Sequence, residues 1–527
     1  MVFYQLFYYI FENSIIVRKL FITDNVYSKL HVQQNLWILL FTTLGIWYIK
    51  YLWSRRKLYW YSMNIPGPFG LPLIGSAVLF IGKESKILSM LQSIQQQFPG
   101  IYKLWMGPDL YFMVSDPKYI EIILNSPRAI EKQFYIYEPF AEILGDGLLT
   151  TNAKKWRHHR KTITPSFNQK ILESFVDVFA DKSKVFAEKI SKLVGKKDVD
   201  WYILVSRCTL DTICETAMGI NMNVQEVNEC SLGECIEILM ELANIRVFNV
   251  YYQNPLAWKM SKMKQEFDEK NNHFQNVISG IIRKKKEEFN LNQLRDLTYN
   301  EDGIKKKNLA FLDLLLENSD LTETELRAEI KTFVGAGTET SAASICAVFT
   351  VLGMFPDIQQ KLYEEMVDIL GLERDVTASD LPKMKYTERV IKETLRLFPV
   401  APAFARTLTG DINLGDKILP SGCSVAFVVA YIHRNPEYWP DPLKFDPDRF
   451  LPEEVAKRHP CTYIPFSYGP RNCIGGRYAI LNIKTVLATV IRQFKIFSEY
   501  KSIEEIELKL QMLLRFKDGY KVWLENR

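Results

Sequence analysis

The segment FSYGPRNCIGG, residues 466–476, sets a cysteine among glycines and a proline, a setting that can change what its thiol does. Gly469 precedes Cys473, Gly475 follows it, and the apolar run 478–491 predicts a helix directly afterwards. Free N–H groups and the dipole at a helix N-terminus stabilise a thiolate. Cys473 is therefore a candidate for a metal-bound or reactive thiolate.

Two other interpretations start from the same residue. An inert buried thiol is the most common fate of a free cysteine, and a Cys/His hydrolase would need a histidine context that the sequence does not offer. The chain has eight scattered cysteines without a CxxC motif, and only six histidines. This pattern excludes zinc-finger and thioredoxin-like chemistry and is typical of a reducing compartment.

The residues around the cysteine also match a longer pattern, FxxGxRxCxG, at each fixed position. Those positions hold Phe466, Gly469, Arg471, Cys473 and Gly475. The loop resembles the haem-binding loop of the cytochrome P450 family. The resemblance implies haem b, held non-covalently apart from one bond between the Cys473 thiolate and iron, and a thiolate that favours O–O cleavage.

Three polar residues upstream resemble a second feature of that family. Glu393 and Arg396 in KETLR lie three apart, so they are neighbours on one helix face, and Arg449 lies in FDPDRF. Alone, an ExxR pair is usually a surface ion pair. In this order before the cysteine loop, the three residues resemble the family's buried network, which braces the haem loop.

The apolar segment 331–349, KTFVGAGTETSAASICAVF, contains two glycines. Each glycine costs about 1 kcal/mol relative to alanine inside a helix, so a helix needs a reason for that space. Close helix packing or a break in the helix is one reason. The segment also resembles the family's central helix, in which Ala336 and Gly337 open a groove for dioxygen. There Thr340 would hydrogen-bond dioxygen, and Glu339 would help to deliver protons through water.

The two propionates of haem need cationic or donor partners. Trp156 and Arg160 in WRHHR lie four apart on one helix face and resemble the propionate-binding helix of the family. Arg406 and the arginine of the cysteine loop resemble two further propionate contacts. His158 and His159 are interpreted as surface residues or as residues behind the immediate site, and not as iron ligands.

A long apolar stretch lies near the N-terminus of the chain. Residues 36–53, LWILLFTTLGIWYIKYLW, have about the length that spans a bilayer, and the basic residues 55–57 favour a cytosolic C-terminal side. A buried core helix is the alternative, while the late start and the missing cleavage site argue against a signal peptide. We expect a transmembrane anchor at 35–54 after an extension of unknown role at 1–34.

The remaining chain predicts one large, mainly α-helical domain with small β-sheets, residues 78–527, after a basic and Pro/Gly-rich hinge at 55–77. Two β-type runs at 101–105 and 110–114 predict a hairpin. Strand-like runs around residues 517–519 predict a second hairpin at the end of the chain. The family resemblance covers this whole length and implies the cytochrome P450 fold.

Sequence segments such as GLLTTNAKKWRHHRKTITPSF are similar to those of an insect-rich clan of the family, which includes fatty-acid omega-hydroxylases. Many of those enzymes carry a glutamate where Ala336 stands, and that glutamate forms an ester to the haem. Alanine cannot form this ester, so non-covalent haem is expected and attack on the terminal carbon is not implied. The pocket walls are expected from five segments: 131–148, 239–256, 333–336, 400–404 and 513–516.

The resemblance implies a membrane-bound monooxygenase on the cytosolic side of the endoplasmic reticulum, which inserts one atom of dioxygen into a fatty acid, terpenoid or xenobiotic. Electrons would come from NADPH through a flavoprotein reductase, with cytochrome b5 as a further candidate partner. The alternatives are a reductase-independent haem-thiolate isomerase or dehydratase and a non-enzymatic haem or ligand carrier. The net charge of +5 is small for this length, and the basic residues are interspersed with acidic ones. No nucleic-acid partner is therefore expected.

Overall fold

A computed structural model describes residues 26–71, 74–80, 86–226, 231–296 and 310–527. The chain divides into two compact units, Met1–Asn64 and Ile65–Arg527. The second unit therefore begins inside the predicted hinge.

The first unit contains the helix that includes the predicted anchor. Helix α3 spans Val26–Ser54 and α4 spans Arg56–Ser62. The stretch Gln34–Ser54 is long and apolar enough to cross a membrane, and none of it is buried. Part of the predicted extension 1–34 is thus helical, and residues 1–25 lie outside the described residues. The basic part of the predicted hinge is also helical, as α4.

The second unit is built mainly from helices, as the sequence predicts. In chain order they are α5 (Ile87–Gln97), α6 (Pro117–Asn125), α7 (Phe134–Leu144), α8 (Ala153–Ile163), α9 (Gln169–Ser174), α10 (Val176–Ser191), α11 (Trp201–Met218), α12 (Ser231–Phe248), α13 (Val250–Gln253), α14 (Pro255–Lys259), α15 (Lys262–Asp296), α16 (Phe311–Asn318), α17 (Glu323–Met354), α18 (Pro356–Leu370), α19 (Lys385–Leu397), α20 (Val429–Ile432), α21 (Pro452–Val455) and α22 (Gly476–Gln493).

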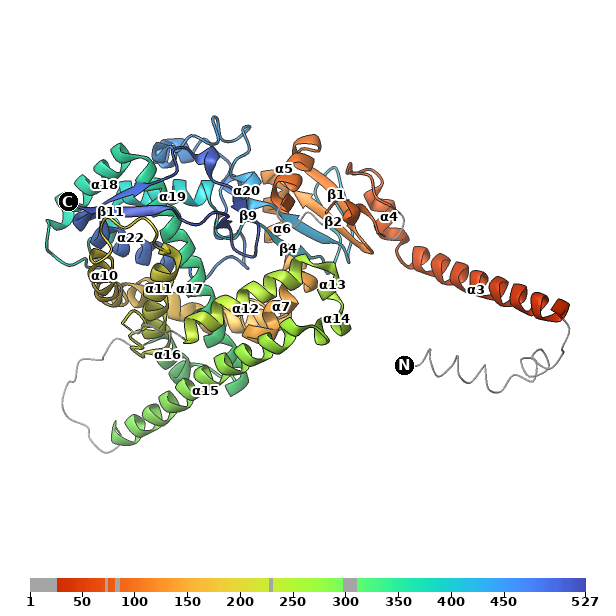
Figure 1. Ribbon diagram of the computed structural model, residues 1–527, viewed down its shortest axis with the longest axis horizontal. Coiled ribbons are helices and arrows are strands. Elements are labelled where there is room, and N and C mark those ends of the chain that lie inside the picture. The colour runs from red at the N-terminus through yellow and green to blue at the C-terminus, as the bar shows by residue number, and fades with distance from the viewer. Residues whose placement is uncertain (1–25, 72–73, 81–85, 227–230, 297–309) are drawn as a thin grey trace. The chain divides into compact units, whose positions relative to one another are not determined.

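A five-stranded sheet packs at one side of these helices (Figure 1), in the strand order β1-β2-β7-β4-β3. Its strands are β1 (Ile101–Met106), β2 (Asp109–Val114), β3 (Glu131–Lys132), β4 (Phe404–Thr407) and β7 (Ser424–Phe427). The predicted hairpin is confirmed as β1 and β2, which pair antiparallel. Strand β7 joins β2 in parallel and β4 antiparallel, so the sheet combines segments about 300 residues apart in sequence.

Helix α17 is the core of the helical part (Figure 1), and it packs against α11 and α22. Thr322 caps its first turn, and Glu325 completes a capping box. Residues 341–352 are all buried, which explains why the segment is apolar on every side. Helix α17 is also long and apolar enough to cross a membrane, but 83% of its apolar 18-residue stretch is buried inside the protein. It is therefore a core helix.

The prediction of a second hairpin at the end of the chain is wrong. Strand β11 (Val522–Asn526) pairs with β8 (Phe494–Ser498), and β9 (Leu508–Lys509) pairs with β10 (Arg515–Phe516). The physical reason is tertiary packing, because the β8–β11 register places Ile496 opposite Leu524 and both side chains are buried in the core. The remaining two-stranded sheet joins β5 (Ile412–Asn413) to β6 (Ile418–Leu419).

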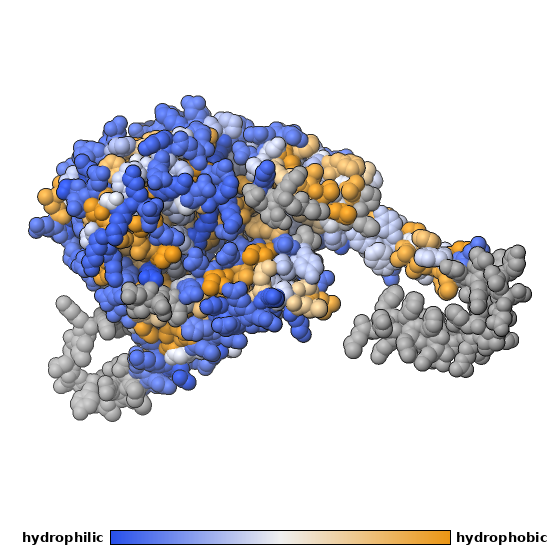
Figure 2. All heavy atoms as spheres, in the orientation of Figure 1, coloured by the Kyte–Doolittle hydropathy of each residue, from blue (hydrophilic) through white to orange (hydrophobic). Residues whose placement is uncertain are grey.

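The surface of the second unit is mostly hydrophilic, and Figure 2 shows this as a largely blue face. Apolar residues also reach the surface on the short helices that follow α12. Tyr251, Leu256 and Met260 are exposed there, with 67%, 71% and 87% of their surfaces accessible. An exposed apolar group of this kind is typical of a surface that contacts another apolar phase.

Candidate active site

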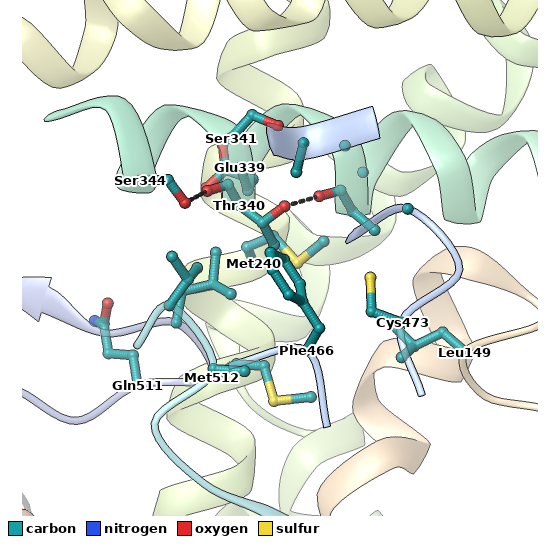
Figure 3. A pocket seen from close by; sticks show the side chains of 18 of the residues that line it. Leu149, Met240, Glu339, Thr340, Ser341, Ser344, Phe466, Cys473, Gln511 and Met512 are labelled. Atoms are coloured by element: carbon teal, nitrogen blue, oxygen red, sulfur yellow. Dashed lines mark hydrogen bonds between the residues drawn. The ribbon is translucent and has the colours of Figure 1, made fainter. Parts of the chain in front are cut away.

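A cavity of about 860 Å³ lies between the cysteine loop and α17. Figure 3 shows Cys473 and Leu149 on one side of it and the α17 residues Glu339, Thr340, Ser341 and Ser344 across from them. The structure therefore brings together a thiol and a helix that are separated by more than a hundred residues in sequence.

Cys473 lies deep in the protein and has accessible surface only because it faces this cavity. Its amide donates to the carbonyl of Phe466 at 2.9 Å. Burial raises the pKa of the Cys473 thiol, while the amides of Gly475 and Gly476 at the start of α22 act to lower it. The amides point at the sulfur and would stabilise a thiolate once a metal ion compensates for burial.

The loop reaches this shape through its glycines. Gly469 has φ +73°, a left-handed conformation, and a Cβ there would collide with the backbone of Leu124. Gly475 has an ordinary φ of −85°, and a Cβ there would lie 3.9 Å from the Cys473 sulfur. Gly469 is thus required by the backbone, whereas Gly475 keeps the space beside the sulfur free.

Four cationic side chains line the cavity, and among the described residues none of these four forms an ion pair with a carboxylate. Lys132 and Arg406 are direct cross-strand partners in β3 and β4 and both line the cavity, together with Arg160 and Arg471. Like charges placed opposite each other destabilise a sheet. Burial, reinforced by Arg406 and Arg471, holds the pKa of Lys132 well below its ordinary value, and burial lowers the pKa of Arg471 to about 10.

The predicted propionate partners occupy defined positions in this group. Arg160 donates to the backbone and side-chain oxygens of Asn472 at 2.9 and 2.8 Å, so α8 is tied to the cysteine loop. Arg471 donates to the carbonyls of Ile130 and Thr151 at 2.6 Å each, while its Nε is buried without a partner. Trp156 is buried, with the Arg471 guanidinium 5.4 Å from its ring.

The cation group fits an anionic cofactor. Two carboxylate groups of a propionate-bearing ring would compensate the unbalanced charge and give the orphaned Arg471 Nε an acceptor. Lys132 belongs to this group, and the sequence analysis did not single it out. A lone lysine carries no spacing signal, and only the β3–β4 pairing reveals it.

The predicted Glu-Arg-Arg group assembles behind the cysteine loop. Glu393 and Arg396 are fully buried and form two hydrogen bonds, at 2.6 and 2.8 Å. Arg449 approaches Glu393 at 3.6 Å, and Arg396 also donates to the carbonyls of His433 and Pro442. A buried pair with this many partners fixes α19 against the segment that leads into the cysteine loop.

The two glycines of the segment 331–349, in the middle of α17, have different neighbours. A Cβ on Gly335 would lie 3.3 Å from Leu144 and 3.4 Å from Met240, two residues of the cavity wall. A Cβ on Gly337 would meet Ile213 of α11 at 2.7 Å. Close packing against α11 accounts for the glycine at position 337, and both Ala336 and Gly337 line the cavity.

The two polar residues of α17 that the sequence singles out have different surroundings. The Thr340 hydroxyl borders the cavity and donates to the carbonyl of Ala336 at 2.6 Å. Glu339 is buried, and its Oε2 accepts from Tyr202 and from Arg515, each at 2.6 Å. Burial, together with the charge of Glu339, raises the pKa of Tyr202 well above its ordinary value. Tyr202 and Arg515 are thus partners that sequence reasoning did not assign.

The histidines next to Arg160 separate into two environments. His158 is half exposed and lies 3.3 Å from the exposed Asp320. His159 is fully buried against Glu329 and does not line the cavity, so of the two interpretations the position behind the immediate site applies to it, and the surface position applies to His158. The reason is the 100° step between neighbouring helix positions, which turns one histidine outward and the next inward.

The cavity walls include parts of all five predicted segments. Tyr137 and Leu144, Met240 and Asn244, and Phe333 and Ala336 come from the first three, and Val400, Phe404, Leu513 and Phe516 come from the other two. Most of these side chains are apolar, and Figure 3 shows Met240 and Met512 reaching into the same space as Phe466. Charged residues line the cavity's outer part: Lys197, Asp198, Lys517 and Asp518.

Comparisons with known proteins cover nearly the whole chain. A family model described as Cytochrome P450 matches residues 65–524. Cytochrome P450 4c21 of Blattella germanica is 36% identical over 493 residues, covering 91% of this chain and 96% of that protein. Cytochrome P450 4c3 of Drosophila melanogaster is 34% identical over 510 residues, covering 93% and 94%. Cytochrome P450 4V2 of Mus musculus is 35% identical over 474 residues, covering 86% and 88%.

Proposed function

We propose a function that builds on one fact: the chain belongs to the cytochrome P450 family. It is a haem-thiolate monooxygenase that uses haem b. We infer that its substrate is lipophilic, that its electrons come from NADPH through a flavoprotein reductase, and that it works at a membrane. One observation supports the proposal most directly: Cys473 lies across one cavity from α17, and the four cationic side chains line the same cavity.

The residues that would hold the cofactor follow from the site. The Cys473 thiolate would bind the iron, and Lys132, Arg160, Arg406 and Arg471 would bind the propionates. When bound, haem supplies the activation of dioxygen and the transfer of one oxygen atom to the substrate. Ala336 offers no carboxylate for an ester, so contacts and the sulfur–iron bond alone would retain the haem.

The protein's own contribution on the α17 side is proton handling. Thr340 can exchange its intrahelical bond to Ala336 for a hydrogen bond into the cavity, where water or substrate lies. Glu339 holds a buried negative charge that Tyr202 and Arg515 stabilise. The charged outer part of the cavity gives water access to this group. We infer a proton route from solvent through Glu339 to Thr340.

The substrate class follows from the walls. Leu144, Met240, Phe404 and Met512 present apolar surface, which excludes water and binds hydrocarbon through burial. Such walls accept a fatty acid, a terpenoid or an apolar foreign compound. Methionine side chains adapt to different shapes, so the site orients a substrate mainly by packing.

The membrane assignment rests on two features of the chain. The stretch Gln34–Ser54 can span a bilayer, and Arg55, Arg56 and Lys57 directly follow it. The exposed apolar residues Tyr251, Leu256 and Met260 give the second unit an apolar surface of its own. We infer attachment to the endoplasmic reticulum membrane with the catalytic unit in the cytosol, where NADPH, the reductase and cytochrome b5 are available.

A reconstitution assay tests the proposed function. Purified full-length protein is combined with haem, lipid, a P450 reductase and NADPH, and a panel of fatty acids, terpenoids and apolar foreign compounds is screened. We expect product that depends on both NADPH and dioxygen and that carries one ¹⁸O atom from ¹⁸O₂. Product from a peroxide without NADPH would indicate the isomerase or dehydratase alternative. Haem binding without any turnover across the panel would favour the carrier.

A further inference from the structure

A buried ion pair lies behind α8, and the function proposed above does not use it. His159 of α8 and Glu329 of α17 are both fully buried. Removing a carboxylate and an imidazolium from water costs several kcal/mol each, and an apolar pair of similar volume would avoid that cost. The pair therefore calls for an explanation beyond stability.

Glu329 joins three segments through one carboxylate. Its Oε1 lies 2.5 Å from His159 Nδ1, and its Oε2 accepts from the backbone amide of Leu148 at 3.0 Å. The loop 145–152, helix α8 and helix α17 meet at this point. Because both oxygens are engaged and no water separates the partners, the three segments are held at a fixed spacing.

Each of these segments carries a residue of the active-site cavity close to the pair. Trp156 and Arg160 lie within one turn of His159 on α8, and Leu148 itself lines the cavity wall. On α17, Ala336 lies two turns beyond Glu329, a rise of about 10 Å. A shift of α8 relative to α17 would therefore move Arg160 relative to the cavity in which the haem would lie.

We propose that His159 and Glu329 are positioning residues for the haem: the pair fixes α8 and the loop 145–152 against α17 so that Arg160 and Trp156 reach the propionates. This inference rests on the proposed function. It assigns no contact between the pair and the cofactor. The effect passes through the backbone of α8 and through Arg160, which is also bonded to Asn472 of the cysteine loop.

The surrounding charges support a protonated His159. Burial lowers the pKa of His159, but hydrogen bonds and charge from Glu329 and Glu325 raise it above its ordinary value. His159 Nε2 lies 3.5 Å from Glu325, which also pairs with Lys155 at 3.2 Å, and Lys155 in turn pairs with Asp146. His159 and Glu329 therefore belong to a network of ion pairs and do not form an isolated hydrogen bond.

The test measures haem loss and needs no turnover. Purified ferric holoenzyme is mixed with an excess of a haem-scavenging apoprotein, and the rate of haem transfer is recorded. We expect His159→Leu and Glu329→Leu each to raise the rate about tenfold or more, and the double variant to match the faster single one, because the two residues act as a unit. His158→Leu is the matched control, since that neighbour is half exposed.

A second comparison keeps the inference testable if the leucine variants do not fold. The amide of asparagine reaches the position of the histidine Nδ1, which faces Glu329, whereas that of glutamine reaches the position of Nε2. We expect His159→Asn to retain haem several-fold longer than His159→Gln. Equal rates for these two variants, or a His159→Leu rate within twofold of the His158→Leu control, would overturn the inference.

Two controls separate the possible causes. The melting temperature of each haem-free variant is measured in parallel, because a purely structural role would lower that temperature without changing the rate of haem loss at a fixed lower temperature. A wild-type chain that binds no haem would contradict the proposed function. A wild-type chain that binds haem, with unchanged variants, contradicts only the positioning role.

Discussion

At the scale of single residues, the active site is defined by charges that the protein itself leaves unbalanced. Lys132 and Arg406 face each other across β3 and β4, and Arg471 has a buried Nε without an acceptor. A folded chain tolerates such an arrangement when a ligand supplies the missing charge. The cation group is therefore best explained as a binding site that is complete only with its anion.

Replacing Cys473 by serine tests the iron ligand. We expect Cys473→Ser to lose the thiolate-type spectrum of the reduced carbon-monoxide complex, because a hydroxyl does not ionise at neutral pH as a metal-bound thiol does. Absorption spectra of the reduced protein with carbon monoxide provide the measurement. Cys461→Ser is the control, since that cysteine is buried outside the cavity. A thiolate spectrum that survives in Cys473→Ser would remove this residue as the ligand.

Replacing Lys132 by methionine tests the cation group. We expect Lys132→Met to weaken haem binding about tenfold or more, since a hydrogen bond to a charged group contributes about 1.5–3 kcal/mol. Titration of the haem-free protein with haem gives the affinity. Lys154→Met, on the exposed side of α8, serves as the comparison and should leave the affinity unchanged. Equal affinities in the two variants would exclude a role for Lys132.

Replacing Thr340 by alanine tests the proposed proton route. We expect Thr340→Ala to consume NADPH at a rate near that of the wild type and to convert several-fold less of it into product, with hydrogen peroxide accounting for the difference. The reason is the loss of the hydroxyl that passes protons into the cavity. The ratio of product to NADPH is measured in the reconstituted system. An unchanged ratio would leave Thr340 with a packing role.

At the scale of elements, the sequence predicts helices and hairpins formed within a short window, but it does not predict which distant segments pair with each other. The β1–β2 hairpin and helix α17 follow from periodicity within a short window. The partner of β11 lies about 25 residues upstream, and that of Lys132 more than 250 residues downstream. No periodicity encodes such pairings, so the last strands were assigned to the wrong partners and Lys132 was missed. The sequence leaves open whether His159 lies at the surface or behind the site, and it does not indicate the partner Glu329, because that residue lies 170 positions away.

Helix α17 also contains a buried cation whose stability effect depends on pH. Lys331 is 6% exposed and donates to two neutral oxygens, the Ile143 carbonyl at 3.2 Å and the Gln275 side chain at 2.9 Å. Burial, assisted by the charge of Arg327, lowers the pKa of Lys331 to about 8. Because the folded pKa lies below the unfolded one, the folded state is penalised below pH 8 and recovers as the pH rises toward 10.5.

The corresponding variant is Lys331→Met. We expect the stability of the wild type relative to Lys331→Met to increase by about 2 kcal/mol as the pH rises from 7.5 to 9.5, because most of the difference between the folded and unfolded pKa of Lys331 is titrated in this range. Melting temperatures of both proteins across this pH range provide the measurement. The difference between the wild type and Lys154→Met should stay constant. A pH-independent difference for Lys331→Met would show that Lys331 titrates normally.

At the scale of the whole molecule, the two units imply a separation between attachment and chemistry. The cavity and its lining residues belong entirely to the unit Ile65–Arg527. The bilayer-length apolar stretch belongs to the other unit, Met1–Asn64. Binding of haem should therefore not require the anchor, while retention in a membrane should depend on it.

Deleting residues 1–54 tests this separation. We expect the shortened protein to bind haem with the spectrum of the full chain. We also expect it to leave the membrane pellet after a high-salt or alkaline wash, since the deletion removes the proposed anchor Gln34–Ser54. Haem content and the fraction in the pellet are measured together. Residual binding in low salt would report the contribution of Tyr251, Leu256 and Met260. A shortened protein that resists both washes would place the main attachment in the second unit.

The contact between Gly337 and Ile213 also limits how this sequence can change over time. A methyl group at position 337 would lie 2.7 Å from Cδ1 and 2.9 Å from Cγ1 of Ile213, so it fits only if that side chain rotates away or becomes shorter. Natural variants and laboratory libraries that enlarge the first without trimming the second should be depleted. A combined Gly337→Ala and Ile213→Ala change removes both close atoms and would instead open a route to a more rigid central helix.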